Sequence, residues 1–326
     1  MYSKELILSP YPNIEDSIVT STNFQADELL QAFFSGKSPK TIEAYKRDLD
    51  DFRQFLEASD MNDVAKILFS DGAHKANFIA LKFRTFLSEQ RRLQPTSVNR
   101  KLAAIRSLVD MANTLGIITW KIRIKNQKIV SSLHDTAGPG KTGVQMLRDE
   151  SAKRTDPKGL RDRAILHLLS DLALRRAEIV GLDLEDINLV TGTLRVLGKA
   201  RLQKETLSLP KSTTKILQEW IVARGDFEGP LFLNFHHNDN VRGKRLTSDG
   251  LYYIIKNLGK KTGQKVRPHG LRHTAITEAV RKTQAIGMDL TKVLKFSRHK
   301  HLNTLQVYID AVEGAQGEIA ELVAAD

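Results

Sequence analysis

Apolar side chains recur at spacings of three and four residues along most of this 326-residue chain. That spacing places them on one face of an α-helix, so the pattern predicts amphipathic helices. Ser38 followed by Pro39 is typical of a helix start, because the first caps the backbone and the second has a helical φ angle. No sustained period precedes Phe24, and residues 1–23 are interpreted as an arm. The pattern predicts a helical domain over residues 24–124, with helices near 25–34, 39–56, 78–87 and 95–109.

A stretch containing basic residues, Gly and Pro breaks the helical pattern. The Gly and Pro residues between Asp135 and Gly143 indicate a linker, placed at residues 125–143. Its Gly140-Lys141-Thr142 is similar to the end of a phosphate-binding loop. The full pattern requires Gly where Asp135 stands, and no strong strand precedes it. The segment is therefore interpreted as a linker rather than a nucleotide site.

Residues 144–326 read as a second domain. Helical patterns are expected near 144–154, 159–174, 213–223, 248–258, 268–282, 289–296 and 304–310. Two strand candidates, 192–197 and 206–210, are joined by a basic turn over 198–204. The expected fold class is mainly α with a small antiparallel β-sheet.

Composition limits the function classes. The formal net charge of +12 favours a polyanionic partner. The absence of cysteine excludes disulfides, thiolate metal sites and a cysteine nucleophile, and it fits a reducing compartment. No apolar run approaches the ~20 residues of a membrane span, and the N-terminus lacks a signal-peptide core. We expect a cytoplasmic protein with no membrane partner.

Several basic and polar side chains are candidates for contact with nucleic-acid phosphates. They lie near the start of the second predicted helix, on the polar side of the fourth, in the linker and in the basic turn. The candidates are Lys40, Thr41, Arg100, Lys101, Arg106, Lys125 and Arg201.

The segment His269-Gly270-Leu271-Arg272-His273 is the most informative one in the second domain. Pro268 can begin a helix there, leaving His269 and Arg272 on one face near its positive end. A guanidinium beside an imidazole suits a phosphate. An ordinary basic helix start explains the segment equally well. Zinc binding by His269 and His273 is disfavoured, because no carboxylate lies between them and Arg272 repels a cation.

Three other segments are uninformative when taken singly. Arg175 and Glu178 have the spacing of an ordinary surface ion pair. Lys199 lies in a basic turn. Tyr308 lies three residues after Leu305, which is the spacing of a core aromatic on a helix, and nine residues after His299.

The ordered set changes this interpretation. Arg175 in Leu-Arg-x-x-Glu, Lys199 in a turn, His269-x-x-Arg272, His299 and Tyr308 together resemble the tyrosine recombinase family of phage integrases and Xer-like enzymes. The resemblance covers most of the chain. It implies a helical core-binding domain followed by an α/β catalytic domain from about residue 145.

The resemblance also implies a chemistry and a role for each residue. Tyr308 attacks DNA to form a 3′-phosphotyrosyl intermediate, with Arg175 and Arg272 clamping the phosphate. His269 is the acid–base partner of Tyr308, His299 donates a further hydrogen bond, Lys199 is the general acid and Glu178 supports the site. No metal or other cofactor is implied.

The implied partner is double-stranded DNA carrying an inverted-repeat recombination site. Family members act as tetramers on paired sites and exchange strands through a four-way junction. The tail after Tyr308, with Ile319, Leu322 and Val323 on its apolar face, is expected to dock on a neighbouring protomer.

The sequence departs from the family pattern at three positions. Ala173 and Arg298 stand where Gly is usual, and Ala200 follows the lysine where Gly is common. Arg176 directly follows Arg175, so either residue could be the arginine of the motif. The spacing to Glu178 favours Arg175. Arg201 and Lys204 share the turn with Lys199. Tyr252 and Tyr253 are rival candidates for the nucleophile, but they precede the His269 motif, whereas the family pattern places the tyrosine after it.

Two alternatives stay open within DNA chemistry and binding. A type IB topoisomerase uses a similar set of residues, and a DNA-binding regulator could keep the fold without the chemistry. A generic basic or RNA-binding protein leaves the order of the motifs unexplained.

Overall fold

Two units make up the computed structural model of the chain, one over Met1–Val130 and one over Ser131–Asp326. The structure describes residues 26–129, 138–198, 201–235, 243–299, 301–310, 312 and 324. The expected N-terminal arm, Lys199, Ala200 and the tail residues Ile319, Leu322 and Val323 lie outside the described residues.

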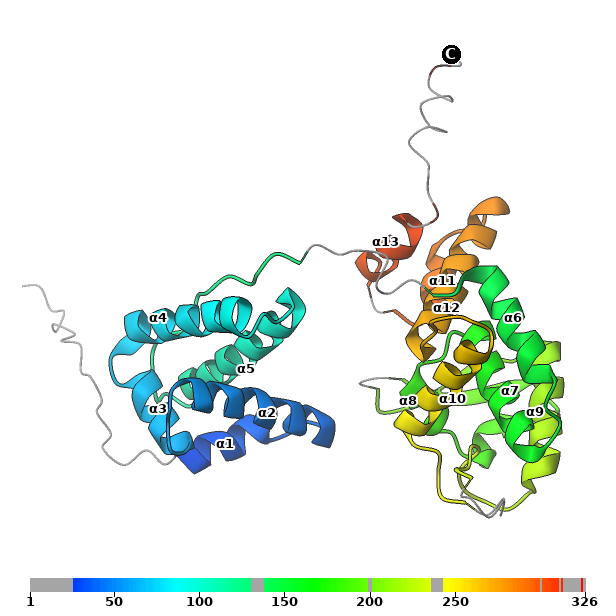
Figure 1. Ribbon diagram of the computed structural model, residues 1–326, viewed down its shortest axis with the longest axis horizontal. Helices are drawn as coiled ribbons and strands as arrows, with labels where there is room; N and C mark the ends of the chain where they lie inside the picture. The colour runs from blue at the N-terminus through cyan, green and yellow to red at the C-terminus, as the bar shows by residue number, and fades with distance from the viewer. Residues whose placement is uncertain are drawn as a thin grey trace, which may run out of the picture. The chain divides into compact units, whose positions relative to one another are not determined.

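Helices are the only regular secondary structure in the described residues of the first unit (Figure 1). Helix α2 begins where Ser38 and Pro39 predicted it, and the Thr41 backbone N–H donates to Ser38 Oγ across 3.2 Å. Helix α3 was not predicted, although Asp60 caps it. The helices are α1 (Ala26–Phe34), α2 (Pro39–Phe55), α3 (Met61–Phe69), α4 (Gly72–Thr85), the π-helix η1 (Phe86–Gln90) and α5 (Pro95–Thr114).

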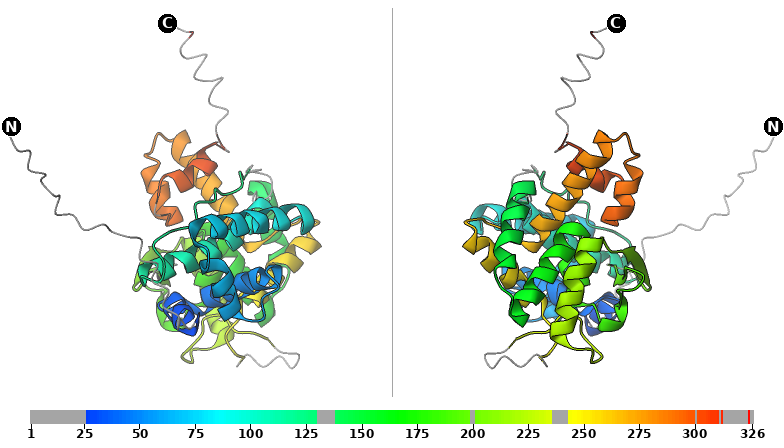
Figure 2. Two further views of the ribbon diagram at one scale, coloured as in Figure 1. Left: turned by 90° about the vertical axis from the view of Figure 1, so that its left-hand side faces the viewer. Right: turned by 90° about the vertical axis from the view of Figure 1, so that its right-hand side faces the viewer.

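The helices of the first unit enclose one hydrophobic core. Phe33, Phe52 and Phe83 are fully buried in it, and the rings of Phe52 and Phe83 meet at 5.0 Å. Helix α5 packs on α1 and α2 (Figure 2). Because each helix buries only one face, the predicted amphipathic stripes account for this core.

Lys101 was expected on the exposed side of α5, and that expectation is wrong. Its side chain is 9% exposed, and its ammonium pairs with Asp51 and, across 3.1 Å, with the buried Asp48. Two carboxylates on α2 draw this cation into the helix interface, because a buried charge needs a partner of opposite sign. A periodicity argument considers one helix alone and does not include that partner.

The second unit is mainly helical, with helices α6, α7 and α9 packed side by side (Figure 2). Trp220 on α9 and Leu168 on α7 belong to its main core. The helices are α6 (Gly140–Ala152), α7 (Pro157–Asp171), α8 (Arg176–Val180), η3 (Leu184–Asp186), α9 (Lys211–Arg224), α10 (Ser248–Lys261), α11 (Pro268–Ala285), α12 (Thr291–Ser297) and α13 (Asn303–Asp310).

The predicted linker extends too far into the second unit. Helix α6 begins at Gly140, so the last four residues of the expected linker are helical. The Gly140 backbone N–H donates to Thr274 Oγ1 on α11 across 3.2 Å, and Gly140 itself has φ +69°. A glycine that reads as a loop signal in the sequence here begins a helix anchored by a tertiary contact.

A small antiparallel sheet completes the second unit, in the order β1 (Ile187–Asn188), β2 (Thr193–Leu197), β3 (Lys204–Ser208). Leu194 opposes Leu207, and Leu197 opposes Lys204 at the end nearest the turn. The fold class expected from the sequence, mainly α with a small antiparallel sheet, is confirmed. Within the described ranges, no helix is both long and apolar enough to cross a membrane.

A second, smaller apolar cluster joins α11, α12 and α13. Ile276, Val293, Leu305 and Ile309 are buried in it together with Tyr308 and Ala173. This cluster fixes the short helix that carries Tyr308 against the helix that carries Arg272.

Candidate active site

Arg175 and Glu178 form a contact at the start of helix α8. The Arg175 backbone N–H donates to one carboxylate oxygen of Glu178 and its Nη1 donates to the other, both across 2.8 Å. Arg176 instead pairs with Asp249 on α10 at 3.5 Å. Arg175 therefore makes the Arg–Glu contact that its spacing predicted, and its side chain is 30% exposed.

Arg272 lies in the interior beside this pair, 1% exposed. Its guanidinium donates to the backbone carbonyls of Ala173 and Ser297, and its Nη2 lies 3.3 Å from His299 Nε2. Burial, followed by the charges of Arg175 and Arg298, lowers the pKa of Arg272 to about 10. One side chain thus connects the segment before α8 with the segment after α12.

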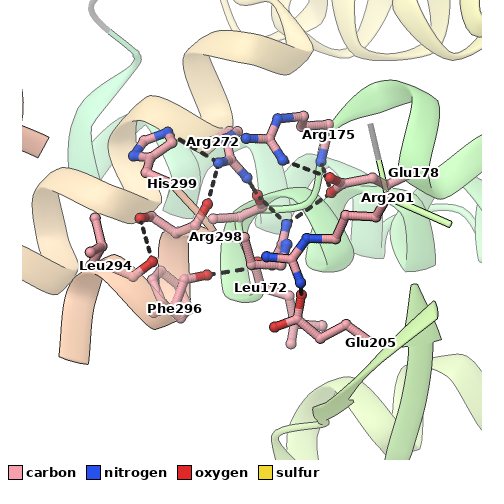
Figure 3. Close-up of polar contacts among 12 residues, drawn as sticks. Leu172, Arg175, Glu178, Arg201, Glu205, Arg272, Leu294, Phe296, Arg298 and His299 are labelled. Carbon is pink, nitrogen blue, oxygen red and sulfur yellow. Dashed lines mark hydrogen bonds and ion pairs between the residues drawn. The ribbon is translucent and has the colours of Figure 1, made fainter. Parts of the chain in front are cut away.

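Arg298 is the second buried arginine of the site (Figure 3). Its Nη2 donates to Glu178 across 2.8 Å and to the Ala173 carbonyl across 3.2 Å. Burial raises the pKa of Glu178, but the charge of Arg298 and the hydrogen bonds from Arg175 outweigh it and hold that pKa below its usual range. Sequence reasoning noted Arg298 as a departure from glycine that adds a charge beside the site and could alter phosphate contacts or activity, but it did not predict the contact with Glu178.

Two imidazoles flank the Tyr308 ring. The centroid of the Tyr308 ring lies 4.5 Å from that of His273 and 5.8 Å from that of His299. Tyr308 is 6% exposed, and burial raises the pKa of its hydroxyl against the opposing effect of Arg272 and Arg175. Sequence reasoning considered His273 only as a possible zinc ligand and missed its contact with Tyr308.

The pKa values of the site histidines are lowered. Burial, followed by the charges of Arg272, Arg175, Arg298 and His269, lowers the pKa of His299 to about 4. His269 lies exposed at the start of α11, and partial desolvation together with the charges of Arg272, Arg175 and Arg267 lowers its pKa. Both imidazoles are therefore neutral at pH 7.

Two of the three cations in the predicted basic turn are engaged in ion pairs. Arg201 pairs with Glu205 at 2.9 Å, and Lys204 donates to both oxygens of the buried Asp186 across 2.6 and 2.7 Å. Lys199, the predicted general acid, lies outside the described residues.

The other predicted phosphate contacts differ in their surroundings. Lys40, Thr41 and Lys125 are exposed. Arg100 is half-exposed and pairs with Asp48, and Arg106 donates to the Ile124 carbonyl across 3.1 Å. The described part of the chain holds no group of three or more His, Asp or Glu side chains that could bind a metal ion.

The arrangement is suited to a phosphate ester. In the site, the guanidinium groups of Arg175, Arg272 and Arg298 surround the single carboxylate of Glu178, which leaves two positive charges in excess. Such preorganised cations stabilise charge that develops on phosphate oxygens. The neighbouring tyrosine can supply a nucleophile.

Family comparison gives the same assignment for both units. Residues 142–314 match the model described as phage integrase family, and residues 28–114 match the one described as phage integrase, N-terminal SAM-like domain. Tyrosine recombinase slr0733 of Synechocystis sp. is 31% identical over 88% of this chain and 91% of that protein. Tyrosine recombinase XerC of Herpetosiphon aurantiacus is 30% identical over 84% of this chain and 85% of that protein.

Solved structures share the fold at lower sequence identity. The XerH site-specific recombinase bound to palindromic difH substrate, in a post-cleavage complex, has a TM-score of 0.67 at 18% identity. That match covers 93% of this chain and 86% of the XerH chain. The Tn1549 transposon integrase in complex with transposon right end DNA has a TM-score of 0.61 at 14% identity, over 90% of this chain and 99% of that one.

Proposed function

The chain belongs to the tyrosine recombinase, or phage integrase, family, and on that premise we propose that it recombines DNA site-specifically through a 3′-phosphotyrosyl intermediate. One observation carries the assignment of its site. Arg175, Glu178, Arg272, His299 and Tyr308, predicted from segments up to 133 residues apart, all lie in one cluster of contacts and charges. A generic basic protein gives no reason for that convergence.

Arg175 and Arg272 hold the scissile phosphate in this proposal. Arg175 offers the accessible guanidinium, and Arg272 lies behind it with its orientation set by the Ala173 and Ser297 carbonyls. Their positive charges offset the negative charge that builds up on the non-bridging oxygens in the transition state. Because the carbonyls hold Arg272 before DNA arrives, little reorganisation accompanies the reaction.

Tyr308 supplies the nucleophile. Its Oη forms a bond to phosphorus while the bond from phosphorus to the 5′-oxygen breaks. The raised pKa of Tyr308 means that the hydroxyl is protonated at pH 7, so it needs a base. His269, neutral at that pH, takes this proton. In religation a 5′-hydroxyl attacks the phosphorus and the bond from phosphorus to Tyr308 Oη breaks. His269 returns its proton to Tyr308, and the general acid of the forward step takes the proton of the hydroxyl.

Lys199 is proposed to protonate the leaving 5′-oxygen. The engagement of Arg201 with Glu205 and of Lys204 with Asp186 supports this choice among the cations of the turn. An ammonium or guanidinium that is paired with a carboxylate is less available to donate a proton to the leaving oxygen.

The proposed substrate is double-stranded DNA with an inverted-repeat site, bound by a tetramer that forms a four-way junction. The XerH structure contains a palindromic substrate, and lambda integrase has been solved as a dimer on a core site. In this proposal residues 24–124 bind DNA, residues 144–326 carry the chemistry and the tail docks on a neighbour. The cytoplasm is the proposed compartment, consistent with a cysteine-free chain.

Covalent trapping on DNA of randomised sequence tests the proposal and selects the DNA site in the same experiment. The full chain is incubated with nicked duplexes of randomised sequence, and denaturant-resistant complexes are isolated and sequenced. We expect enrichment of an inverted repeat, loss of the complex in Tyr308→Phe and retention in the controls Tyr252→Phe and Tyr253→Phe. A complex that persists in Tyr308→Phe contradicts the proposed nucleophile. Complexes without enrichment, together with relaxation of any supercoiled plasmid, indicate the topoisomerase alternative.

A further inference from the structure

Arg298 occupies a backbone conformation that favours glycine. It ends helix α12 with φ +55° and ψ +34°, in the left-handed region. A long charged side chain at a helix end is usually solvated. Here the guanidinium turns inward, and the side chain is 4% exposed. The site therefore contains a second buried cation, whose guanidinium is directed at Glu178 and at the carbonyls of Leu172 and Ala173.

The contacts of Arg298 lie on the elements that hold the catalytic arginines. Its Nη2 donates to Glu178 Oε2 across 2.8 Å, the same oxygen that accepts the Arg175 backbone N–H. Its Nη1 donates to the Leu172 carbonyl across 3.2 Å, and the Ala173 carbonyl accepts from both Arg298 and Arg272. Arg298 is thus joined to Arg175 through Glu178 and to Arg272 through Ala173 (Figure 3).

The charge of Arg298 changes the balance at the site. Without it, Glu178 would face only Arg175 and Arg272, leaving one net positive charge. With it, the network keeps two positive charges, closer to the charge that a phosphodiester acquires in its transition state.

We propose that Arg298 is a positioning residue that compensates the charge of Glu178, so that Arg175 and Arg272 present their full charge to the scissile phosphate. The inference rests on the proposed recombinase function. It assigns Arg298 no contact with DNA.

A packing role alone explains the burial poorly. The Nε atom of Arg298 is buried without a hydrogen-bond partner among the described residues, and burying a guanidinium is costly. An apolar side chain could fill the same volume at lower cost. The ion pair with Glu178 offsets this cost, and Glu178 in turn positions Arg175.

Four variants separate charge from packing. Arg298→Lys keeps the charge, Arg298→Met keeps much of the length, and Arg298→Gly relieves the left-handed backbone. The fourth, Arg298→Met combined with Glu178→Gln, removes both charges and keeps one acceptor for Arg175. Arg281→Met, which removes an exposed cation paired with Glu278 on α11, is the matched control.

The first measurement is the rate of covalent complex formation at saturating concentrations of the selected DNA. We expect Arg298→Met and Arg298→Gly to lose about tenfold or more, with Arg298→Lys and Arg281→Met close to the unsubstituted protein. The double variant is expected to recover most of the loss, because removing Glu178's charge restores two net positive charges. Equal rates in all variants, or a double variant slower than Arg298→Met, overturn the proposal.

The second measurement requires no DNA. NMR titration of His299 in the full chain reports the charge of Arg298, since Arg272, Arg175, Arg298 and His269 all face that imidazole. We expect the pKa of His299 to rise in Arg298→Met and to stay low in Arg298→Lys. An unchanged pKa in Arg298→Met contradicts the electrostatic role. If the unsubstituted protein forms no covalent complex, the recombinase proposal fails, while this titration still decides whether Arg298 acts on the site.

Discussion

The Nη2 atom of Arg272 lies 3.3 Å from the Nε2 atom of His299, within hydrogen-bond distance. An imidazole accepts at Nε2 only when that nitrogen carries no proton. The contact therefore favours neutral His299, in agreement with its pKa of about 4. Two motifs separated by 27 residues are joined by this contact, in the site that we propose to bind the scissile phosphate.

Arg272→Lys is expected to impair both activity and stability. A lysine keeps the charge but cannot donate to the Ala173 carbonyl, the Ser297 carbonyl and His299 in the same fork geometry. We expect covalent complex formation to fall about 100-fold and the free energy of unfolding to fall by about 2 kcal/mol. Rates on trapping substrate and urea denaturation measure these effects. The exposed Arg281→Lys serves as the control, and equal losses in both variants would show that Arg272 has no special role.

Acidification is expected to destabilise the second unit through its histidines. The pKa values of His269, His273 and His299 are all lowered in the native state, so the unfolded chain binds more protons as the pH falls below about 6.5. The free energy of unfolding therefore falls between about pH 6.5 and 4. Urea denaturation across that range should show that the free energy of unfolding declines less steeply in His299→Asn than in the unsubstituted protein. The same decline in both proteins would contradict a contribution of His299.

Lys199→Ala is expected to block cleavage of ordinary DNA and to spare a substrate with sulfur in place of the 5′-bridging oxygen. A thiolate leaves without protonation, because thiols are far more acidic than alcohols. Lys204→Ala, which breaks the ion pair with Asp186, is the matched control. The Lys204→Ala protein is expected to cleave the oxygen-containing and the sulfur-containing substrates at similar rates. A Lys199→Ala protein equally slow on both substrates would exclude a role as general acid.

Substitution of Lys101 is expected to lower the stability of the protein, whereas substitution of Lys125 is expected to weaken DNA binding. Lys101→Met leaves Asp51 without its ammonium partner and leaves Asp48 paired only with Arg100 among the described residues, so we expect a loss of about 2 kcal/mol in stability. Lys125→Ala removes an exposed charge. It should leave stability unchanged, weaken DNA binding and lower the salt slope of log Kd by about 0.9. Binding titrations at several salt concentrations check this, and an unchanged slope contradicts a phosphate contact by Lys125.

Most helices of both units could be predicted because their apolar periodicity is local. Helix α2 begins at the predicted residue, because Ser38 caps it and Pro39 occupies its first turn. Helix α3 escaped prediction, although Asp60 caps it and Val64 and Leu68 lie buried on one face. The start of α6 was misplaced because Gly140 is held by Thr274, a contact 134 residues distant.

The sequence by itself determined the helical class and the family, because these depend on local spacing and on the order of motifs, and it supplied candidate residues for the proposed phosphate site. Only the tertiary structure decided that Lys101 is buried, that His273 packs on Tyr308 and that Arg298 turns inward. The physical reason is common to all three. Whether a charged or aromatic side chain faces water or the interior depends on the partner that another element brings to it, and a single segment does not contain that partner.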